Sequence, residues 1–174
     1  MTEELPLPAL IESLLFVADE PVSVGQLATV LEVPPTRVEE ALKDLEQQLS
    51  RRGLRLQRLG ERVQLVTMPE AAPYVERLLG LGERRRLSQA ALETLAIVAY
   101  RQPISRPEIE AIRGVNCDSV LRTLLAAGLI EEAGRAPTPG RPILYATTFA
   151  FLQHFGLSRL ADLPPLNGPE GSPR

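Results

Sequence analysis

The sequence predicts an α+β fold, mainly helical with small β-hairpins, arranged as two tandem winged-helix domains. The chain contains an internal repeat, and each copy reads as three helices followed by a two-stranded hairpin. Apolar residues make up 44% of the 174 residues, but aromatic residues only 4%, so aliphatic side chains on short helices must build the cores. A domain of about 80 residues buries too little surface to be more than marginally stable alone. We therefore expect a second copy or a bound partner.

The repeat can be followed position by position. Residues 11–18 (IESLLFVA) match residues 92–99 (LETLAIVA), with an acid, a small hydroxyl and apolar residues in the same order. After a short gap, residues 21–27 (PVSVGQL) align with residues 103–109 (PISRPEI). Self-similarity of this kind indicates two copies of one structural unit.

A capping signal marks the start of the second helix in each copy. Ser23 is followed by Gln26, and Ser105 by Glu108. In a capping box the hydroxyl accepts a hydrogen bond from the N3 amide, while the N3 side chain reaches back to the cap. Each pair therefore predicts that a helix begins immediately after the serine.

Apolar periodicity predicts a third helix in each copy, at about residues 35–51 and 117–127. The apolar positions with helical spacing are Val38, Ala41, Leu42, Leu45 and Leu49 in the first helix and Val120, Leu121, Leu124 and Leu125 in the second. Because these residues share one face, only the opposite face of each helix is expected to be exposed.

Alternating residues after each third helix predict the wings. Residues 54–56 and 63–65 alternate as strands, and Gly60 between them suits the first position of a tight turn. In the second copy, strands at 129–132 and 143–145 are joined by a segment rich in Gly and Pro. A further helix is expected to close each unit, at about residues 71–79 and 148–155.

These elements predict the domain boundaries. The first winged-helix domain, expected to mediate dimerisation, covers residues 1–80, and a linker with glycines and charges covers 81–86. The second domain covers residues 87–157, and a tail covers 158–174, whose last residues we expect to be disordered. Apolar periodicity continues over residues 157–166, so this segment either packs back or docks a partner.

Charge and cysteine content restrict the class of protein. The net charge is −3, with 13 acids against 8 bases through Gly80 and 9 against 11 after it, so neither half is strongly basic. Nucleic-acid binders draw affinity from neutralised phosphates, so this balance argues against DNA as the principal ligand. The single cysteine, Cys117, excludes an internal disulfide and multi-cysteine metal sites. Neither a signal peptide nor a membrane-spanning run is recognised, so we expect a cytoplasmic protein.

The segment Leu87–Ile104 (LSQAALETLAIVAYRQPI) resembles the signature of the segregation and condensation protein B family. Residues 113–115 (RGV), 128–130 (GLI), 140–142 (GRP) and 163–166 (LPPL) are also similar to the family's pattern, although Ala146 stands where that pattern has Gly.

The resemblance implies a protein that dimerises through its first domain and binds the middle of the kleisin subunit, segregation and condensation protein A. The kleisin in turn bridges the heads of an SMC ATPase, which supplies the chemistry. The expected role is therefore that of a non-enzymatic adaptor, without cofactor, acting at the nucleoid in chromosome condensation and segregation during cell division.

Candidate interface residues are chosen from the aromatic side chains, the family-like motifs and the apolar helix faces. Aromatic side chains are typical interface anchors, and five of the chain's seven Phe and Tyr residues lie in the second domain. The candidate partner-binding residues are Tyr100, Pro103, Arg141, Pro142, Tyr145 and Phe149. The candidate dimer-interface residues, from apolar faces of the first domain, are Leu10, Leu14, Leu27 and Leu31.

Two other classes of function remain as alternatives. A winged-helix, DNA-binding transcriptional regulator is favoured by arginines at the first wing and in the linker, although the preferred reading is that these are solvated charges interleaved with Glu61 and Glu83. They are Arg51, Arg52, Arg55, Arg58, Arg62, Arg84, Arg85 and Arg86. An enzyme has little support, because the only histidine, His154, and Cys117 lack an evident catalytic neighbour and are read as packing residues.

Overall fold

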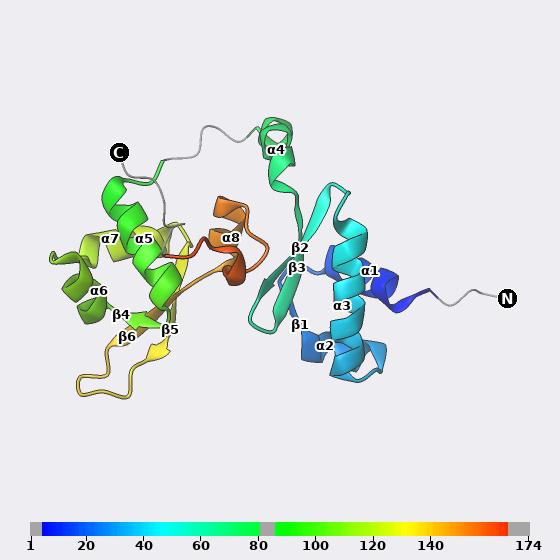
Figure 1. Cartoon of the computed structure of the whole chain (residues 1–174), viewed down its shortest axis with the longest axis horizontal. Coiled ribbons are helices and arrows are strands. Elements are labelled where there is room, and N and C mark those ends of the chain that lie inside the picture. The colour runs from blue at the N-terminus through cyan, green and yellow to red at the C-terminus, as the bar shows by residue number, and fades with distance from the viewer. Residues whose placement is uncertain (1–4, 81–85, 167–174) are drawn as a thin grey trace. The chain divides into compact units, whose positions relative to one another are not determined.

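The computed structural model describes residues 5–80 and 86–166. The expected α+β class is confirmed, because helices are combined with two small antiparallel sheets (Figure 1). The chain forms two compact units: residues up to Thr67, together with those from Gly156 onward, make the first, and residues 68–155 make the second. The first unit is therefore built from two separate stretches of sequence.

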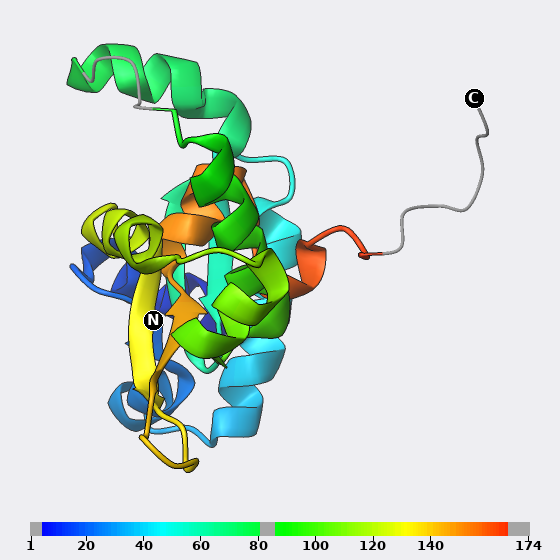
Figure 2. The same ribbon diagram turned by 90° about the vertical axis from the view of Figure 1, so that its left-hand side faces the viewer.

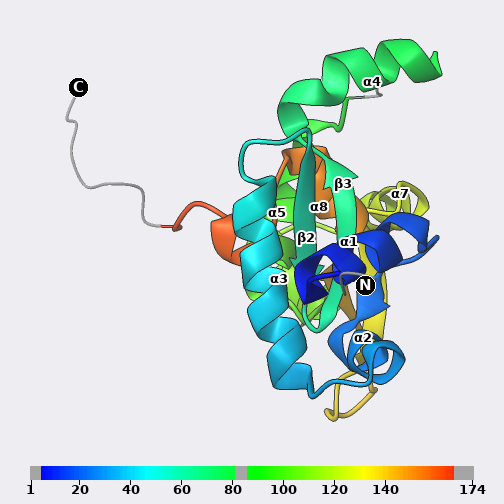
Figure 3. The same ribbon diagram turned by 90° about the vertical axis from the view of Figure 1, so that its right-hand side faces the viewer.

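The first unit has the element order of a winged helix. It contains α1 (Leu7–Val17), β1 (Val22–Ser23), α2 (Val24–Leu31), α3 (Pro35–Leu49), β2 (Leu54–Leu59) and β3 (Arg62–Thr67). The three strands are antiparallel in the order β1-β3-β2, so β2 forms one edge of the sheet. Figure 3 shows α1 and α3 together on one side of β2 and β3.

The second unit repeats that order. It contains a 3₁₀ helix η1 (Pro69–Ala71), α4 (Ala72–Leu79), α5 (Gln89–Arg101), β4 (Ile104–Ser105), α6 (Arg106–Arg113), α7 (Asp118–Ala126), β5 (Ile130–Arg135), β6 (Ile143–Thr147) and α8 (Phe149–Phe155). Its sheet has the equivalent order β4-β6-β5. The connection between β5 and β6 extends beyond the neighbouring helices (Figure 2).

Both predicted capping signals begin a helix where the sequence placed them. The Gln26 amide donates to Ser23 Oγ at 3.1 Å, and the Ser23 amide donates to Gln26 Oε1 at 2.9 Å. In the second unit, Glu108 Oε2 accepts from the Ser105 amide at 2.8 Å and from the Ser105 hydroxyl at 2.5 Å. The amide donors in these contacts are groups that a helix start leaves unpaired, whereas the Ser105 hydroxyl donates to the Glu108 carboxylate.

In each wing hairpin a glycine adopts a positive φ angle. Leu59 pairs with Arg62, which leaves Gly60 at the first position of a two-residue loop with a φ of +60°. Glycine adopts this left-handed conformation without steric cost. In the second wing the pairing shifts between Glu132 and Arg135, where Gly134 has a φ of +104°.

Each unit has its own aliphatic core, as the composition predicted. In the first unit the core joins α1, α2, α3 and the sheet, and its fully buried members include Ile11, Leu27, Val38, Leu45 and Val63. In the second unit the corresponding residues include Leu95, Ile109, Leu124, Ile130 and Leu152. Burial of such side chains is the main force that holds each unit together.

The two expected closing helices behave differently. Helix α8 buries Phe151 and Leu152 and so closes the core of the second unit. Helix α4 forms where the sequence placed it, but it buries no side chain. Tyr74 is 69% exposed and Leu78 is 85% exposed, so the expectation that α4 closes the first unit's core is wrong.

Candidate interaction surface

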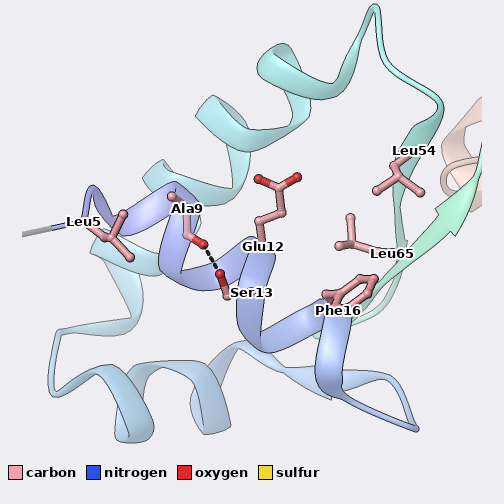
Figure 4. Close-up of a pocket in the computed structure, with 7 residues that line it drawn as sticks. All are labelled: Leu5, Ala9, Glu12, Ser13, Phe16, Leu54 and Leu65. Carbon is pink, nitrogen blue, oxygen red and sulfur yellow. Dashed lines mark hydrogen bonds between the residues drawn. The ribbon is translucent and has the colours of Figure 1, made fainter.

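An open groove crosses the first unit between α1 and the wing strands β2 and β3. Its volume is about 360 Å³. The residues that line it are Leu5, Ala9, Glu12, Ser13, Phe16, Leu54 and Leu65. Figure 4 shows Leu54 and Leu65 on the strands, facing α1 and the ring of Phe16. Glu12 contributes the single charged side chain and Ser13 a hydroxyl, and the other five lining residues are apolar.

Helix α1 exposes an apolar surface beside this groove. Phe16 is 82% exposed, Val17 is 73% exposed and Leu5 is 59% exposed. The helix already points Ile11 and Leu15 into the core, so residues one position further along face about 100° away. A helix that is apolar on more than one side has surface for more than one partner. We call Leu5, Phe16 and Val17, with the groove, the α1 surface.

The four residues proposed for the dimer interface have different environments. Leu27 is 1% exposed and belongs to the core of the first unit. Leu14 and Leu31 are half-buried and pack against that core, and Leu10 is also half-buried. The structure therefore places Leu27 inside the unit and leaves Leu10, Leu14 and Leu31 partly accessible, whereas Phe16 and Val17 of the α1 surface are exposed. Their assignment to an interface stays a prediction.

Of the proposed partner-binding residues, only Tyr145 lies in a strand of the second unit's sheet. Tyr145 is in the middle of β6, opposite Ile104 of β4, and it is only 8% exposed. Burial raises the pKa of Tyr145, with a further contribution from the charge of Glu132. Exposed Pro103 precedes β4, and half-buried Tyr100 lies at the end of α5.

The remaining three proposed residues lie at opposite ends of β6. Arg141 and Pro142 precede the strand at the wing tip, whereas Phe149 follows it at the start of α8. A five-residue strand is about 17 Å long, so the six side chains do not form one compact cluster. Arg141 is exposed, and its φ of +41° is unusual for a residue with a side chain. Which of these residues contact a partner stays a prediction.

Several arginines at the first wing are already engaged within the protein. Arg58 forms a bidentate ion pair with Glu39 of α3, with both nitrogen–oxygen distances 2.6 Å. The Arg58 hydrogen bonds hold the pKa of Glu39 below its ordinary value. Arg62 donates to the Pro21 carbonyl, and Arg55 donates to the Gly156 carbonyl at 2.9 Å. Arg51 and Arg52 are exposed, and among the described residues neither guanidinium forms a hydrogen bond or an ion pair like those of the other three wing arginines.

The helices that would read DNA also carry paired charges. In α7, Asp118 contacts Arg122 and accepts from Arg106 Nη1 at 3.0 Å. These partners lower the pKa of Asp118, with Arg122 the larger cause and Arg106 the smaller. In α3, Arg37 lies 3.8 Å from Glu40. A phosphate would have to compete with these carboxylates, which weakens the case for direct DNA recognition. The predicted linker arginines Arg84 and Arg85 lie outside the described residues.

Neither a metal site nor a membrane helix is found in the described part of the chain. Over residues 5–80 and 86–166, no three His, Cys, Asp or Glu side chains are grouped so as to hold a metal ion. Over the same ranges, no helix combines the length and the apolar character needed to cross a membrane.

Comparison with known proteins identifies the family. The model of the family "Segregation and condensation complex subunit ScpB" matches residues 9–166. Segregation and condensation protein B of Desulforamulus reducens is 50% identical over 161 residues, which cover 90% of this chain and 87% of that protein. This chain belongs to the ScpB family.

Solved structures of the same family are also similar to this chain. ScpB from Mycobacterium tuberculosis is 45% identical, and the likeness covers 88% of this chain and 99% of that chain with a TM-score of 0.42. A dimer of an ScpB N-terminal domain complexed with an ScpA peptide is 38% identical, and the likeness covers 42% of this chain and 94% of that chain with a TM-score of 0.40.

The family assignment confirms the resemblance seen in the sequence, but sequence reasoning missed the α1 surface. The available signal was the run Leu14–Val17, four consecutive apolar residues on one helix. One face of an amphipathic helix accommodates only two of four consecutive positions, so at least part of this run had to point away from the core. For this member of the ScpB family, the surface adds a candidate contact beyond those chosen from the family's motifs.

Proposed function

We propose that this chain is a non-enzymatic subunit of a bacterial condensation complex. It binds the kleisin, segregation and condensation protein A, and through it the SMC ATPase, at the nucleoid in the cytoplasm. The observation that carries this proposal is the family match over residues 9–166, which spans both units. The groove and the exposed apolar residues of the first unit support a binding role.

The first unit is the proposed dimerisation domain, and a second copy is the proposed occupant of the α1 surface. Phe16 and Leu5 expose apolar area that a single unit leaves in water. Removing such area from water is favourable by roughly 25 cal/mol per Å². A small unit with a modest core gains most from this kind of association.

Light scattering on the full chain tests the dimer. We expect the parent protein to have twice the monomer mass and the Phe16→Glu variant to have the monomer mass, because a carboxylate in the interface would be desolvated. The matched control is Val30→Glu, since Val30 is also exposed, at 64%, but does not line the groove. A parent that is a monomer across the micromolar range, or a Phe16→Glu variant that remains a dimer, contradicts this proposal.

Kleisin binding is placed mainly on the second unit, where most of the aromatic residues lie. Co-purification from cell extract should recover a kleisin as the dominant bound protein. Calorimetry with the middle segment of that kleisin then measures the affinity directly. If the protein is folded and dimeric but binds no kleisin segment, the proposal of kleisin binding is contradicted and the proposal of a dimer is not.

DNA binding remains the second candidate, favoured by the exposed Arg51 and Arg52 near the first wing and by the exposed Arg86. The internal pairing of Arg58, Arg55 and Arg62 leaves few wing cations available for phosphates. We therefore assign DNA a weak or indirect role in the complex.

A further inference from the structure

The segment that follows α8 returns to the first unit and lies against the edge strand β2. The carbonyl oxygens of three consecutive residues in this segment accept hydrogen bonds from three donors on β2. Arg55 Nη1 donates to the Gly156 oxygen at 2.9 Å, Gln57 Nε2 to the Leu157 oxygen at 2.7 Å, and the Arg58 amide to the Ser158 oxygen at 2.8 Å. The segment is thus bound mainly through its backbone.

The side chain of Gln57 is held in one orientation, which fixes where the Leu157 carbonyl binds on β2. Gln57 is 2% exposed, and its Oε1 accepts from Gln64 Nε2 at 2.9 Å. That bond orients the amide so that Nε2 points to the Leu157 carbonyl. A buried amide donor without a partner is unfavourable, so the strand edge is less stable at this point when the segment is absent.

Two further contacts shape the segment and anchor it to α3. The carboxylate of Asp162 accepts from the Ser158 amide at 3.0 Å and from the Arg159 amide at 3.1 Å, next to the 3₁₀ helix η2 (Leu160–Asp162). The guanidinium of Arg159 forms an ion pair with Glu46 of α3. Figure 3 shows this segment beside α3.

The covered position is the exposed edge of the sheet. Because the strand order is β1-β3-β2, the outer side of β2 has no strand neighbour. Such edges present unpaired backbone groups that can pair with another chain, and proteins commonly cover them with a loop. Residues 156–160 are half-buried in this position.

We propose that residues 156–162 are a strap that docks in cis on the outer edge of β2 and closes this edge against pairing with other chains. The docking site consists of Arg55, Gln57, the Arg58 amide and Glu46, and it binds the carbonyl oxygens of residues 156–158 and the guanidinium of Arg159. The strap is distinct from the α1 surface, so it does not depend on the proposed function.

Amide hydrogen exchange in the full-length protein tests the docking. The Arg58 amide should exchange about fivefold or more faster in Arg159→Glu than in the parent, because the ion pair with Glu46 becomes a repulsion. The Val24 amide, which donates to Glu61 in the same unit, should be unchanged. The control variant Glu40→Arg alters charge on α3 away from the strap and should leave both amides as in the parent. Equal exchange of the Arg58 amide in Arg159→Glu and the parent would overturn the proposal.

Swapping the charges of Glu46 and Arg159 tests whether the strap docks on its own chain. The double variant Glu46→Arg with Arg159→Glu restores an ion pair within one chain, so Arg58 protection should return to near the parent's level. An equimolar mixture of the two single variants, after dissociation and reassociation, should remain unprotected. Protection that returns in the mixture would show that the strap docks on a second copy and would overturn the cis assignment.

Concentration-dependent light scattering tests the closing role. Arg159→Glu should form larger assemblies than the parent at high concentration, whereas the double variant and Glu40→Arg should match the parent. A variant with a released Arg58 amide that gains no association would overturn the role of the strap as an edge cover.

Discussion

Arg58 of the first wing and Glu39 of α3 form two parallel hydrogen bonds of 2.6 Å each, which tie the hairpin to the third helix. A planar guanidinium matches a carboxylate in this geometry, so the pair fixes orientation as well as distance. An arginine that could have been read as a DNA contact is thus engaged within the domain. Two measurable consequences for the stability of the first unit follow from this pair.

Replacing Arg58 with Gln should lower the free energy of unfolding by about 1 kcal/mol. The two side chains are 33% and 36% exposed, so solvent reduces the value of the pair to that of a good surface ion pair. Urea denaturation measures the loss. Arg52→Gln, an exposed arginine close by in the sequence, should change stability by less than about 0.5 kcal/mol. Equal losses in both variants would show that the Glu39 contact contributes nothing.

The stabilisation by this pair should disappear in acid. The hydrogen bonds from Arg58 lower the pKa of Glu39 from its ordinary value of 4.5. Stability from a carboxyl with a lowered folded-state pKa is fully present above the unfolded pKa and is lost as the pH falls through the folded pKa. Urea curves at a series of pH values should show the difference between the parent and Arg58→Gln shrinking as the pH falls below 4.5. A difference that stays constant down to strong acid would contradict this assignment.

Ser105→Ala should raise the pKa of Glu108 and destabilise the second unit by about 1 kcal/mol. The Ser105 hydroxyl is the main cause of the lowered pKa of Glu108, and the Ser105 amide adds to it. Carbon-detected NMR titration follows the Glu108 carboxyl. Ser23→Ala is the matched control, because it removes the equivalent cap of α2 next to the uncharged Gln26. It should lower stability similarly and leave the pKa of Glu108 unchanged.

Tyr145→Ala and Arg141→Ala should separate packing from partner contact. Tyr145 is 8% exposed, so its truncation should cost about 3–5 kcal/mol of stability. Arg141 is exposed at the wing tip, so Arg141→Ala should melt within a few degrees of the parent while its affinity for the kleisin segment falls about tenfold or more. Thermal unfolding and calorimetry must be recorded on the same samples. Unchanged affinity in a folded Arg141→Ala variant would place the kleisin site elsewhere.

Binding to mixed DNA duplexes should be weak and strongly dependent on salt. The paired charges of Asp118 with Arg122 and of Arg58 with Glu39 leave few cations for phosphates. Fluorescence anisotropy at low and physiological salt measures the effect, and the affinity should fall steeply between them. A tight, sequence-dependent complex at physiological salt would favour the transcriptional regulator instead.

Local rules explain how much of the fold can be predicted from the sequence. The starts of α2 and α6 depend on side chains three residues apart, Ser23 with Gln26 and Ser105 with Glu108. The turn at Gly60 depends on one backbone angle, and the third helices depend on apolar spacing. Each of these signals lies within one or two helical turns, so the chain around it needs no other information.

The sequence by itself determined the repeat, the order of helices and strands, and the resemblance that the family match confirms. Only the tertiary structure decided that Leu27 and Tyr145 are buried, that Phe16 is exposed, and that the strap docks on β2. Gln57 and Leu157 are 100 positions apart, and no local pattern relates them. Periodicity shows that a residue is apolar, but which of several apolar faces a helix buries depends on the elements that pack against it.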